Sequence, residues 1–314
     1  MKKLILISCY FGKLPNYFQP FLDSCSWNSN IDFLIFSDDK TQFRVPSNVK
    51  IEYLEFSEIQ NIIFSKIGKW AKLSSAYKLC DYKPTYGLLF QEKIKDYAYW
   101  GHCDIDLIWG RLEKFVFPLL EEEYDRIFRN GHLTIYRNND KVNESFKLNY
   151  SGLNFKAVYS TDIHCGFDEM SGTWLLAQEN GLHIYEKDVC IDLKRPSLAP
   201  NLASYTSIDA DKQCFLIQKG CVNHIFLPDT ESYQRIENAY IHFQQRKVSV
   251  PSILDINKSY QFLYNRIEEI PSSCSIEICL QNNFQIFPKV EILKRNLKNL
   301  KKSIRYKIFK LTRR

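Results

Sequence analysis

Two aspartates separated by a single residue are the strongest chemical signal in the chain. Asp104 and Asp106 lie within Trp100–Gly110, at the end of an apolar stretch and between glycine and aromatic residues. On an extended strand, side chains at i and i+2 point to one face, so both carboxylates can reach one hard dication, Mn²⁺ or Mg²⁺. Such an ion keeps open positions for phosphate oxygens. The flanking residues favour a metal–phosphate site, and a turn capped by aspartates is the alternative.

A distant histidine is a candidate third ligand for that ion. His242 lies in the short apolar segment Tyr240–Phe243, which has the pattern of a strand. Imidazole is compatible with Mn²⁺, so His242 would complete a site made with Asp104 and Asp106. A histidine satisfied within the core is the alternative.

A second acidic pair ends the second apolar run. Asp38 and Asp39 follow the apolar segment that begins at Ile31. Acids at the carboxyl end of a parallel strand often face a ligand crevice, so a ribose or base contact is expected, with loop capping as the alternative. The candidate cations for a diphosphate are Lys72, Lys78 and Arg137, which are otherwise typical of a solvated helix face.

A third acidic pair, Asp168 and Glu169, follows His164-Cys165-Gly166. A carboxylate here could accept a proton from an attacking hydroxyl group. An acid that stabilises a helix dipole is the alternative. The pair is therefore a candidate for the catalytic base.

The elements that must position these residues alternate between strand and helix patterns over the first 110 residues or so. With 45% hydrophobic residues and only 11 Gly and 11 Pro, the chain is globular rather than disordered or collagen-like. The alternation predicts an α/β fold with a mostly parallel sheet flanked by helices. Strand patterns cover 2–12, 31–39, 49–56, 131–139 and 238–248. Helix patterns cover 14–29, 69–96 with a break at Pro84, and 111–130, and 273–288 resembles a hairpin.

Charge divides the chain unevenly. Residues 289–314 contain eleven Lys and Arg and one acid, which gives this segment a charge of +10. Because the whole chain has a net charge of +6, the remaining residues have a net charge of −4. Apolar residues recur every three or four positions from Leu293 to Leu311, which predicts a basic amphipathic helix for an anionic membrane surface. Packing against its own domain or a second copy is the alternative, and the acidic remainder disfavours nucleic acid. The expected organisation is 1–250 (halves 1–110 and 111–250), an extension 251–288, and this tail.

The cysteines and the amino terminus indicate the cytoplasm. None of the ten cysteines forms a C-x-x-C pair, and the apolar run Leu4–Ile7 is shorter than the roughly 7 residues of a signal-peptide core. Scattered thiols suit a reducing compartment. We therefore expect a cytoplasmic protein, peripheral on the inner face of the cell membrane.

These segments together resemble a family of bacterial glycosyltransferases of capsule and lipopolysaccharide biosynthesis with the GT-A fold. The resemblance covers roughly residues 1–250, and the part around Trp100–Gly110 is its most specific segment. It is carried by Tyr10-Phe11, Ser37-Asp38-Asp39, Tyr77–Pro84, Trp100–Asp106, Gly131–Asn138 and Tyr240–Phe243.

The resemblance implies a metal-dependent transfer of a sugar, of the hexosyltransferase type, from a nucleotide-diphospho-sugar such as a UDP-sugar. Tyr10 and Phe11 would flank the base, Asp38 or Asp39 would contact base or ribose, Asp104 and Asp106 would hold the ion, and His242 would be the late metal ligand. The acceptor, a saccharide or lipid-linked saccharide, would bind in the second half of the chain. If Asp168 or Glu169 acts as base, the transfer inverts the configuration of the anomeric carbon. If neither reaches the acceptor, a mechanism that retains this configuration stays open.

Two other functions remain alternatives. A metal-dependent sugar-phosphate phosphatase would use Asp104 as nucleophile, but such enzymes usually carry a small hydroxyl residue where this chain has Ile108. A non-catalytic saccharide-binding protein of the same fold is the other, although Asp104, Asp106 and His242 are all in place.

Overall fold

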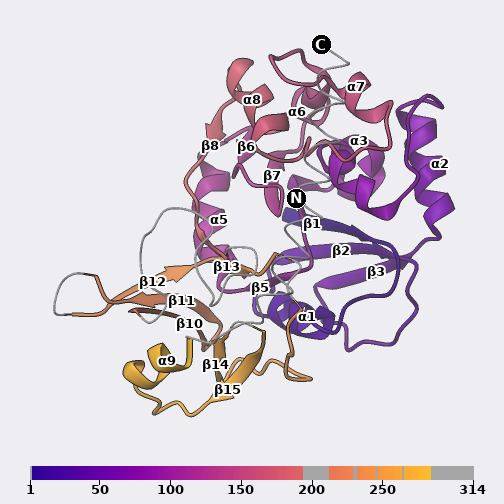
Figure 1. Ribbon diagram of the computed structural model, residues 1–314. Helices are drawn as coiled ribbons and strands as arrows, with labels where there is room; N and C mark the ends of the chain where they lie inside the picture. The colour runs from indigo at the N-terminus through magenta and orange to yellow at the C-terminus, as the bar shows by residue number, and fades with distance from the viewer. Residues whose placement is uncertain (1, 194–211, 229–231, 245–246, 264, 284–314) are drawn as a thin grey trace.

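The parallel part of the main sheet is built from the segments that read as strands in the sequence. The computed structural model describes residues 2–193, 212–228, 232–244, 247–263 and 265–283 (Figure 1). Strand β1 (Lys2–Tyr10) lies between β2 (Ile31–Ser37) and β4 (Tyr97–Cys103), and β3 (Val49–Tyr53) extends the sheet beyond β2. All of these pairings are parallel, so the carboxyl ends of the four strands meet at one edge.

Three further strands widen this sheet to seven. They are β7 (Leu133–Arg137), β6 (Arg126–Ile127) and β8 (Ile184–Tyr185), in the order β3-β2-β1-β4-β7-β6-β8. Strand β7 is antiparallel to both β4 and β6, and β6 is parallel to β8, so four of the six pairings are parallel. The predicted α/β fold with a mostly parallel mixed sheet is confirmed.

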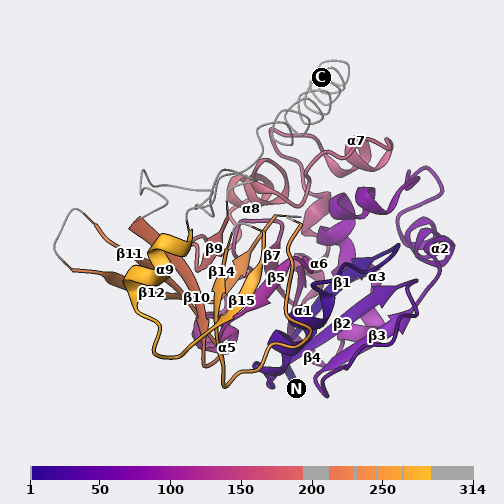
Figure 2. The same cartoon turned by 60° about the horizontal axis from the view of Figure 1, so that its bottom comes forward.

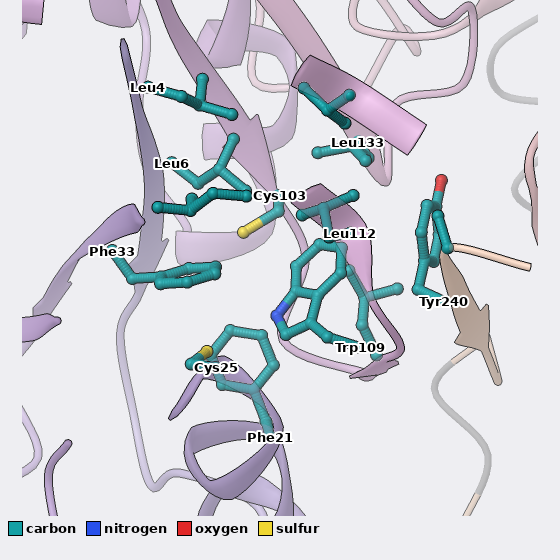
Figure 3. Close-up of a cluster of buried hydrophobic side chains, with 14 of the residues drawn as sticks. Leu4, Leu6, Phe21, Cys25, Phe33, Cys103, Trp109, Leu112, Leu133 and Tyr240 are labelled. Carbon is teal, nitrogen blue, oxygen red and sulfur yellow. The ribbon is translucent and has the colours of Figure 1, made fainter. Parts of the chain in front are cut away.

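Helices cover both faces of the sheet, which explains why its strands are apolar almost throughout. Leu4 and Leu6 of β1 face one core, together with α1 (Phe18–Ser26) and α5 (Leu112–Glu121). The alternate residues of β1 face a second core formed with α2 (Phe56–Lys66) and the helical turns that follow it. Figure 1 shows α1 and α2 on opposite sides of the strands, and Figure 3 shows Leu4 and Leu6 in the same buried cluster as Phe21 and Trp109.

The described residues also form two smaller sheets. Strand β5 (Leu107–Trp109) pairs antiparallel with β13 (Tyr240–His242), which pairs parallel with β9 (Cys190–Asp192). The other sheet is antiparallel, with the order β12-β11-β10-β14-β15, and Figure 2 shows it beside the main sheet. Its strands are β12 (Gln234–Asn238), β11 (Cys221–Phe226), β10 (Gln213–Gln218), β14 (Ser259–Phe262) and β15 (Ile267–Ile270).

Three sequence predictions of local structure were wrong. The region 69–96 holds no single long helix but the three short helices η1 (Ala76–Thr85), α3 (Tyr86–Leu89) and α4 (Gln91–Ile94), and the helix expected over 111–130 ends at Glu121 as α5. The hairpin expected in 273–288 is a helix, α9 (Ile276–Asn283), which packs on β10 and buries Cys279 and Leu280. Further short helices are α6 (Asp140–Asn143), η2 (Ser145–Lys147), α7 (Phe155–Tyr159), η3 (Met170–Trp174) and α8 (Leu175–Glu179).

The expected division near residue 250 falls between β13 and β14. Strand β14 pairs with β10, so that division runs through the five-stranded sheet. The basic tail 289–314 lies outside the described residues. Among the helices that the structure describes, none has both the length and the apolar character needed to cross a bilayer.

Candidate active site

The Asp-x-Asp segment lies where the chain leaves one sheet and enters another. Strand β4 ends at Cys103 in the main sheet, and β5 begins at Leu107 in the three-stranded sheet. Backbone hydrogen bonds secure both ends of the crossing: the Asp104 N–H donates to the His132 carbonyl at 3.0 Å, and the Phe243 N–H donates to the Asp106 carbonyl at 3.2 Å. The two carboxylates are thus held at the carboxyl end of the parallel strands, where ligands bind in open α/β sheets.

Strand pairing brings His242 to the same place from 136 residues further along the chain. In the β5–β13 ladder His242 lies opposite Leu107, next to Asp106. Its Nε2 is 3.6 Å from Asp106 Oδ1. One ligand atom from each of Asp104, Asp106 and His242 can be chosen so that all three lie within 4.8 Å of one another. The structure therefore brings together the three residues that the sequence singled out as metal ligands.

This donor set fits a divalent cation. Two carboxylates and one imidazole suit Mn²⁺, and donor atoms this close can share one ion at the usual ligand distances of about 2.0–2.5 Å. Burial alone would lower the pKa of His242, but the Asp106 and Asp192 carboxylates outweigh burial and raise it to about 10. Nε2 must lose its proton to bind a metal, so cation binding and proton release are linked at this histidine.

A lysine that the sequence analysis did not select is the cation closest to the pair. Lys83, on η1, is buried, and its Nζ lies 2.6 Å from Asp104 Oδ1 and 3.0 Å from Asp168 Oδ2. It also donates to the Gly131 carbonyl at 2.9 Å. Burial opposes the charge, but Asp104 and Asp168 outweigh it and raise the pKa of Lys83 well above its usual value. The ammonium therefore stays charged and links Asp104 to Asp168.

The two candidate catalytic carboxylates lie beyond Lys83. Asp168 is only 2% exposed, and its Oδ1 has no hydrogen-bond partner among the described residues. Burial raises the pKa of Asp168 to about 6, against the opposing effect of Lys83. Glu169 is exposed at the surface, and its Oε2 accepts a hydrogen bond from the Gly131 N–H at 3.2 Å. Partial burial of its carboxyl group and the charge of Asp168 raise the pKa of Glu169.

A glycine makes this close arrangement possible. A Cβ built on Gly131 would lie 2.7 Å from Asp168 Oδ2, closer than real Cβ atoms approach other atoms, and 3.0 Å from Glu169 Cδ, which is a tight contact. Any larger residue at this position would push the two acids away from Lys83. Gly131 was part of the segment that carries the sequence resemblance. Its role as a spacer depends on its contact with Asp168, which lies 37 residues further along the chain.

Of the two aromatic residues expected beside a base, Tyr10 is the one that lies close enough to Asp106 to sense its charge. Tyr10 ends β1 and is half-buried, and burial together with the Asp106 carboxylate raises its pKa. Phe11 is buried in the core, with its ring centroid 5.5 Å from that of Phe56. Tyr17, which the sequence analysis did not select, has its pKa raised by burial and by Asp106, and so also lies near the pair.

Asp38 and Asp39 use their carboxylates to shape a loop. Asp38 Oδ1 accepts a hydrogen bond from the Gly12 N–H at 2.6 Å, and Asp39 accepts from the Leu14 N–H at 2.8 Å and from Thr41. The loop-capping alternative is therefore present in the structure. The same two acids line an open depression of about 340 Å³ with Gly12, Lys13 and Thr41, beside the ends of β1 and β2.

The cations expected to bind a diphosphate do not gather at the site. The prediction was wrong for Lys78, which is 1% exposed and donates to Asp81 Oδ2 and to the carbonyls of Val158 and Ile163, so its three N–H groups are used. Arg137 pairs with Glu123 and lies opposite Tyr99, near the start of β4, whereas Asp104 follows the end of that strand. Lys72 is exposed, and no described contact joins it to Asp104.

Two solved structures share a distant likeness with the chain. The chain is similar to the apo form of mouse xyloside xylosyltransferase 1, with a TM-score of 0.37 and 7% identity over 61% of this chain and 87% of that chain. It is also similar to the glycosyltransferase GlyE of Streptococcus pneumoniae TIGR4, with a TM-score of 0.31 and 11% identity over 59% of this chain and 45% of that chain. At these scores the likeness carries no argument about function.

Comparison with curated proteins finds no match. A protein-family model described as a family of unknown function, DUF6625, matches residues 6–271, which include the second half of β1 and every described element from α1 to β15. Because that match spans most of the chain, the protein belongs to the DUF6625 family.

Proposed function

We propose that the protein is a glycosyltransferase that moves a sugar from a nucleotide-diphospho-sugar to a saccharide acceptor. The observation that carries the proposal is the convergence of Asp104, Asp106 and His242 within 4.8 Å at the carboxyl edge of a parallel sheet. Hard carboxylate oxygens with one imidazole suit a cation that binds phosphate oxygens. A pair of acids with raised pKa values, Asp168 and Glu169, lies next to this cluster.

In this proposal the donor lies along the ends of β1, β2 and β4. Its nucleoside would occupy the depression beside Asp38 and Asp39, with Tyr10 toward the base, and a UDP-sugar is the first donor to test. Asp104, Asp106 and His242 would hold Mn²⁺ or Mg²⁺. When bound, the ion neutralises charge that develops on the departing diphosphate. Lys83 keeps the Asp104 carboxylate oriented through the ion pair with Oδ1.

The acceptor hydroxyl needs a base, and of the two neighbouring acids Glu169 is the better placed. Glu169 is exposed and can be reached by an acceptor, whereas Asp168 is buried against Lys83. The Glu169 carboxylate takes the hydroxyl proton as the acceptor oxygen bonds to the anomeric carbon, and the bond from that carbon to the diphosphate breaks with its electron pair leaving on the diphosphate. With Glu169 as base, the reaction is a single displacement that inverts the anomeric carbon.

The acceptor and the cellular setting extend the proposal beyond the described residues. A lipid-linked saccharide of bacterial surface polysaccharide synthesis is the acceptor expected from the sequence resemblance. Association of the basic tail 289–314 with the inner membrane surface stays a prediction, to be tested by co-sedimentation of the full chain and of a chain ending at 288 with anionic liposomes.

A thermal-shift screen tests the donor site directly. Nucleotide-sugars are added to the full chain with Mn²⁺ or with EDTA, since a ligand that binds only the folded state raises the unfolding temperature. We expect a Mn²⁺-dependent shift from one nucleotide-sugar, and we expect Asp104→Asn and Asp106→Asn to abolish it. The matched control is Asp96→Asn, an exposed acid just before the opposite end of β4.

Chemistry is then followed with the ligand that the screen identifies. Mn²⁺-dependent release of the nucleoside diphosphate with transfer of the sugar supports the proposal, and Glu169→Gln should slow transfer without weakening donor binding. Donor shifts that persist in both Asp104→Asn and Asp106→Asn would remove the metal-site argument. Release of inorganic phosphate from a sugar phosphate without an acceptor would support a phosphatase instead.

A further inference from the structure

His242 has a second partner on the side away from the Asp-x-Asp pair. Its Nδ1 lies 2.8 Å from Asp192 Oδ1, and the same oxygen accepts a hydrogen bond from Gln244 Nε2 at 2.9 Å. The contact follows from the fold, because β9 runs parallel to β13 with Asp192 directly opposite His242. Both acids that flank the ring are therefore placed by the three-stranded sheet, Asp106 through β5 and Asp192 through β9.

We propose that Asp192 is a positioning residue of the cation site, whose carboxylate holds the Nδ1–H of His242 and thereby turns Nε2 toward Asp104 and Asp106. The inference rests on the proposed function, because it concerns the same cation. It deepens that function by naming the residue that orients the nitrogen ligand, which no residue pattern in the sequence indicated.

The chemistry of imidazole explains why such a partner matters. A neutral histidine carries one N–H and one lone pair, and a metal binds only the nitrogen with the lone pair. A carboxylate can only accept, so it fixes the hydrogen on Nδ1 and leaves Nε2 as the ligand. Nε2 is the nitrogen on the Asp106 side, 3.6 Å from Oδ1.

The surroundings of the ring support a fixed orientation. The His132 ring lies beside that of His242, with the two centroids 4.3 Å apart, and His132 Nδ1 is itself 3.0 Å from the Tyr240 hydroxyl. Burial and the neighbouring His242 lower the pKa of His132 to about 3, so this ring is uncharged at neutral pH. On the Nδ1 side of the His242 ring, the charged partner is therefore Asp192, which forms a short hydrogen bond with Nδ1.

A competing arrangement uses the same residues. His132, Asp192 and His242 also offer three ligand atoms within 4.8 Å, so a cation could bind there with Asp192 as a direct ligand. The existing hydrogen bonds favour the positioning role, because Asp192 Oδ1 already accepts from both His242 and Gln244. The two arrangements differ in their dependence on Asp104, which belongs only to the proposed site.

The test measures Mn²⁺ binding by the full chain without any sugar donor. Free Mn²⁺ is followed by its electron paramagnetic resonance signal, and spin-echo modulation from ¹⁴N reports whether an imidazole binds the metal. We expect Asp192→Ala to weaken Mn²⁺ binding 10- to 100-fold, the range found when such an outer partner is removed. Asp192→Asn should lose less, because its amide oxygen can still accept the Nδ1–H. The matched control is Asp188→Asn, which removes an acid of the same segment that pairs with Arg129.

Each outcome decides between the alternatives. Wild-type affinity and an unchanged ¹⁴N signal in Asp192→Ala would overturn the inference while leaving the cation site intact. Loss of binding in Asp192→Ala together with normal binding in Asp104→Asn would place the cation at His132 instead and overturn it as well. Absence of Mn²⁺ binding in the wild-type chain would reject the proposed function itself. Thermal unfolding in EDTA separates these results from misfolding, and Asp192→Asn, which keeps the shape of the side chain, serves if Asp192→Ala does not fold.

Discussion

The ammonium of Lys83 lies 2.6 Å from Oδ1 of Asp104, so the first carboxylate of the Asp-x-Asp pair is ion-paired within the protein. The same nitrogen is 3.0 Å from Asp168 Oδ2, and the Lys83 side chain is only 9% exposed. Lys83 therefore connects the candidate metal ligands to the candidate catalytic acids. A buried ion pair of this kind contributes little net stability, but removing one partner strands the other charge.

We expect Lys83→Met to destabilise the protein by about 3–5 kcal/mol, because Asp168 would remain buried without a counter-charge. Adding Asp168→Asn should recover part of that loss, since the stranded charge is then removed. Urea unfolding of wild type, the two single variants and the double variant gives the coupling free energy between Lys83 and Asp168. Effects that simply add would show that Lys83 and Asp168 do not interact.

Two lysines only six positions apart should respond very differently to the same change. Lys78 is buried, and its ammonium pairs with Asp81 at 2.8 Å, whereas Lys72 is exposed. Lys78→Met should cost about 3 kcal/mol or more of stability, because Asp81 loses its buried counter-charge, and Lys72→Met should stay within about 0.5 kcal/mol. Equal unfolding midpoints for the two variants would contradict the structural role of Lys78.

Gly131→Ala should damage the site through a contact rather than through the backbone. Its Cβ would lie 2.7 Å from Asp168 Oδ2, so the acid must shift, at an expected cost of about 1–3 kcal/mol. Sugar transfer should fall at least tenfold. Gly181→Ala is the control: it strains a backbone with φ of +64°, but its Cβ meets nothing within 4 Å, so stability should drop while activity per folded molecule is kept. Equal activities for the two variants would refute the spacer role.

The buried His224 should make stability depend on pH. It lies on β11 between the rings of Phe215 and Phe226, and burial lowers its pKa to about 4. Between pH 4 and about 6.5 the unfolded chain binds the proton and the folded chain does not, so stability rises with pH across this window. The full effect is about 3 kcal/mol. It is measured as the difference in unfolding free energy between wild type and His224→Asn, which should grow from pH 4 to 6.5. A difference that is constant with pH would show that this imidazole is not the cause.

The sequence by itself determined the parts of the site that depend on short spacing. An apolar run followed by Asp104 and Asp106 indicated paired carboxylates at a strand end, and the alternation of strand and helix patterns indicated the mostly parallel sheet. Both features follow from interactions between near neighbours along the chain, such as the two-residue period of a strand. His242 was a candidate because imidazole is compatible with Mn²⁺, whereas its place on a short apolar strand fitted a core histidine equally well.

Tertiary structure decided which charged groups meet. Lys72, Lys78 and Lys83 fall within twelve residues of sequence that reads as one helix, but the structure has only the short helix η1 there, and of the three lysines only Lys83 contacts Asp104. Asp192 reaches His242 through the parallel pairing of β9 with β13, fifty residues apart. Such contacts arise from strand register and from burial on opposite faces of a sheet, which a local pattern does not encode. The charge of each lysine is visible in the sequence, whereas its partner depends on the fold.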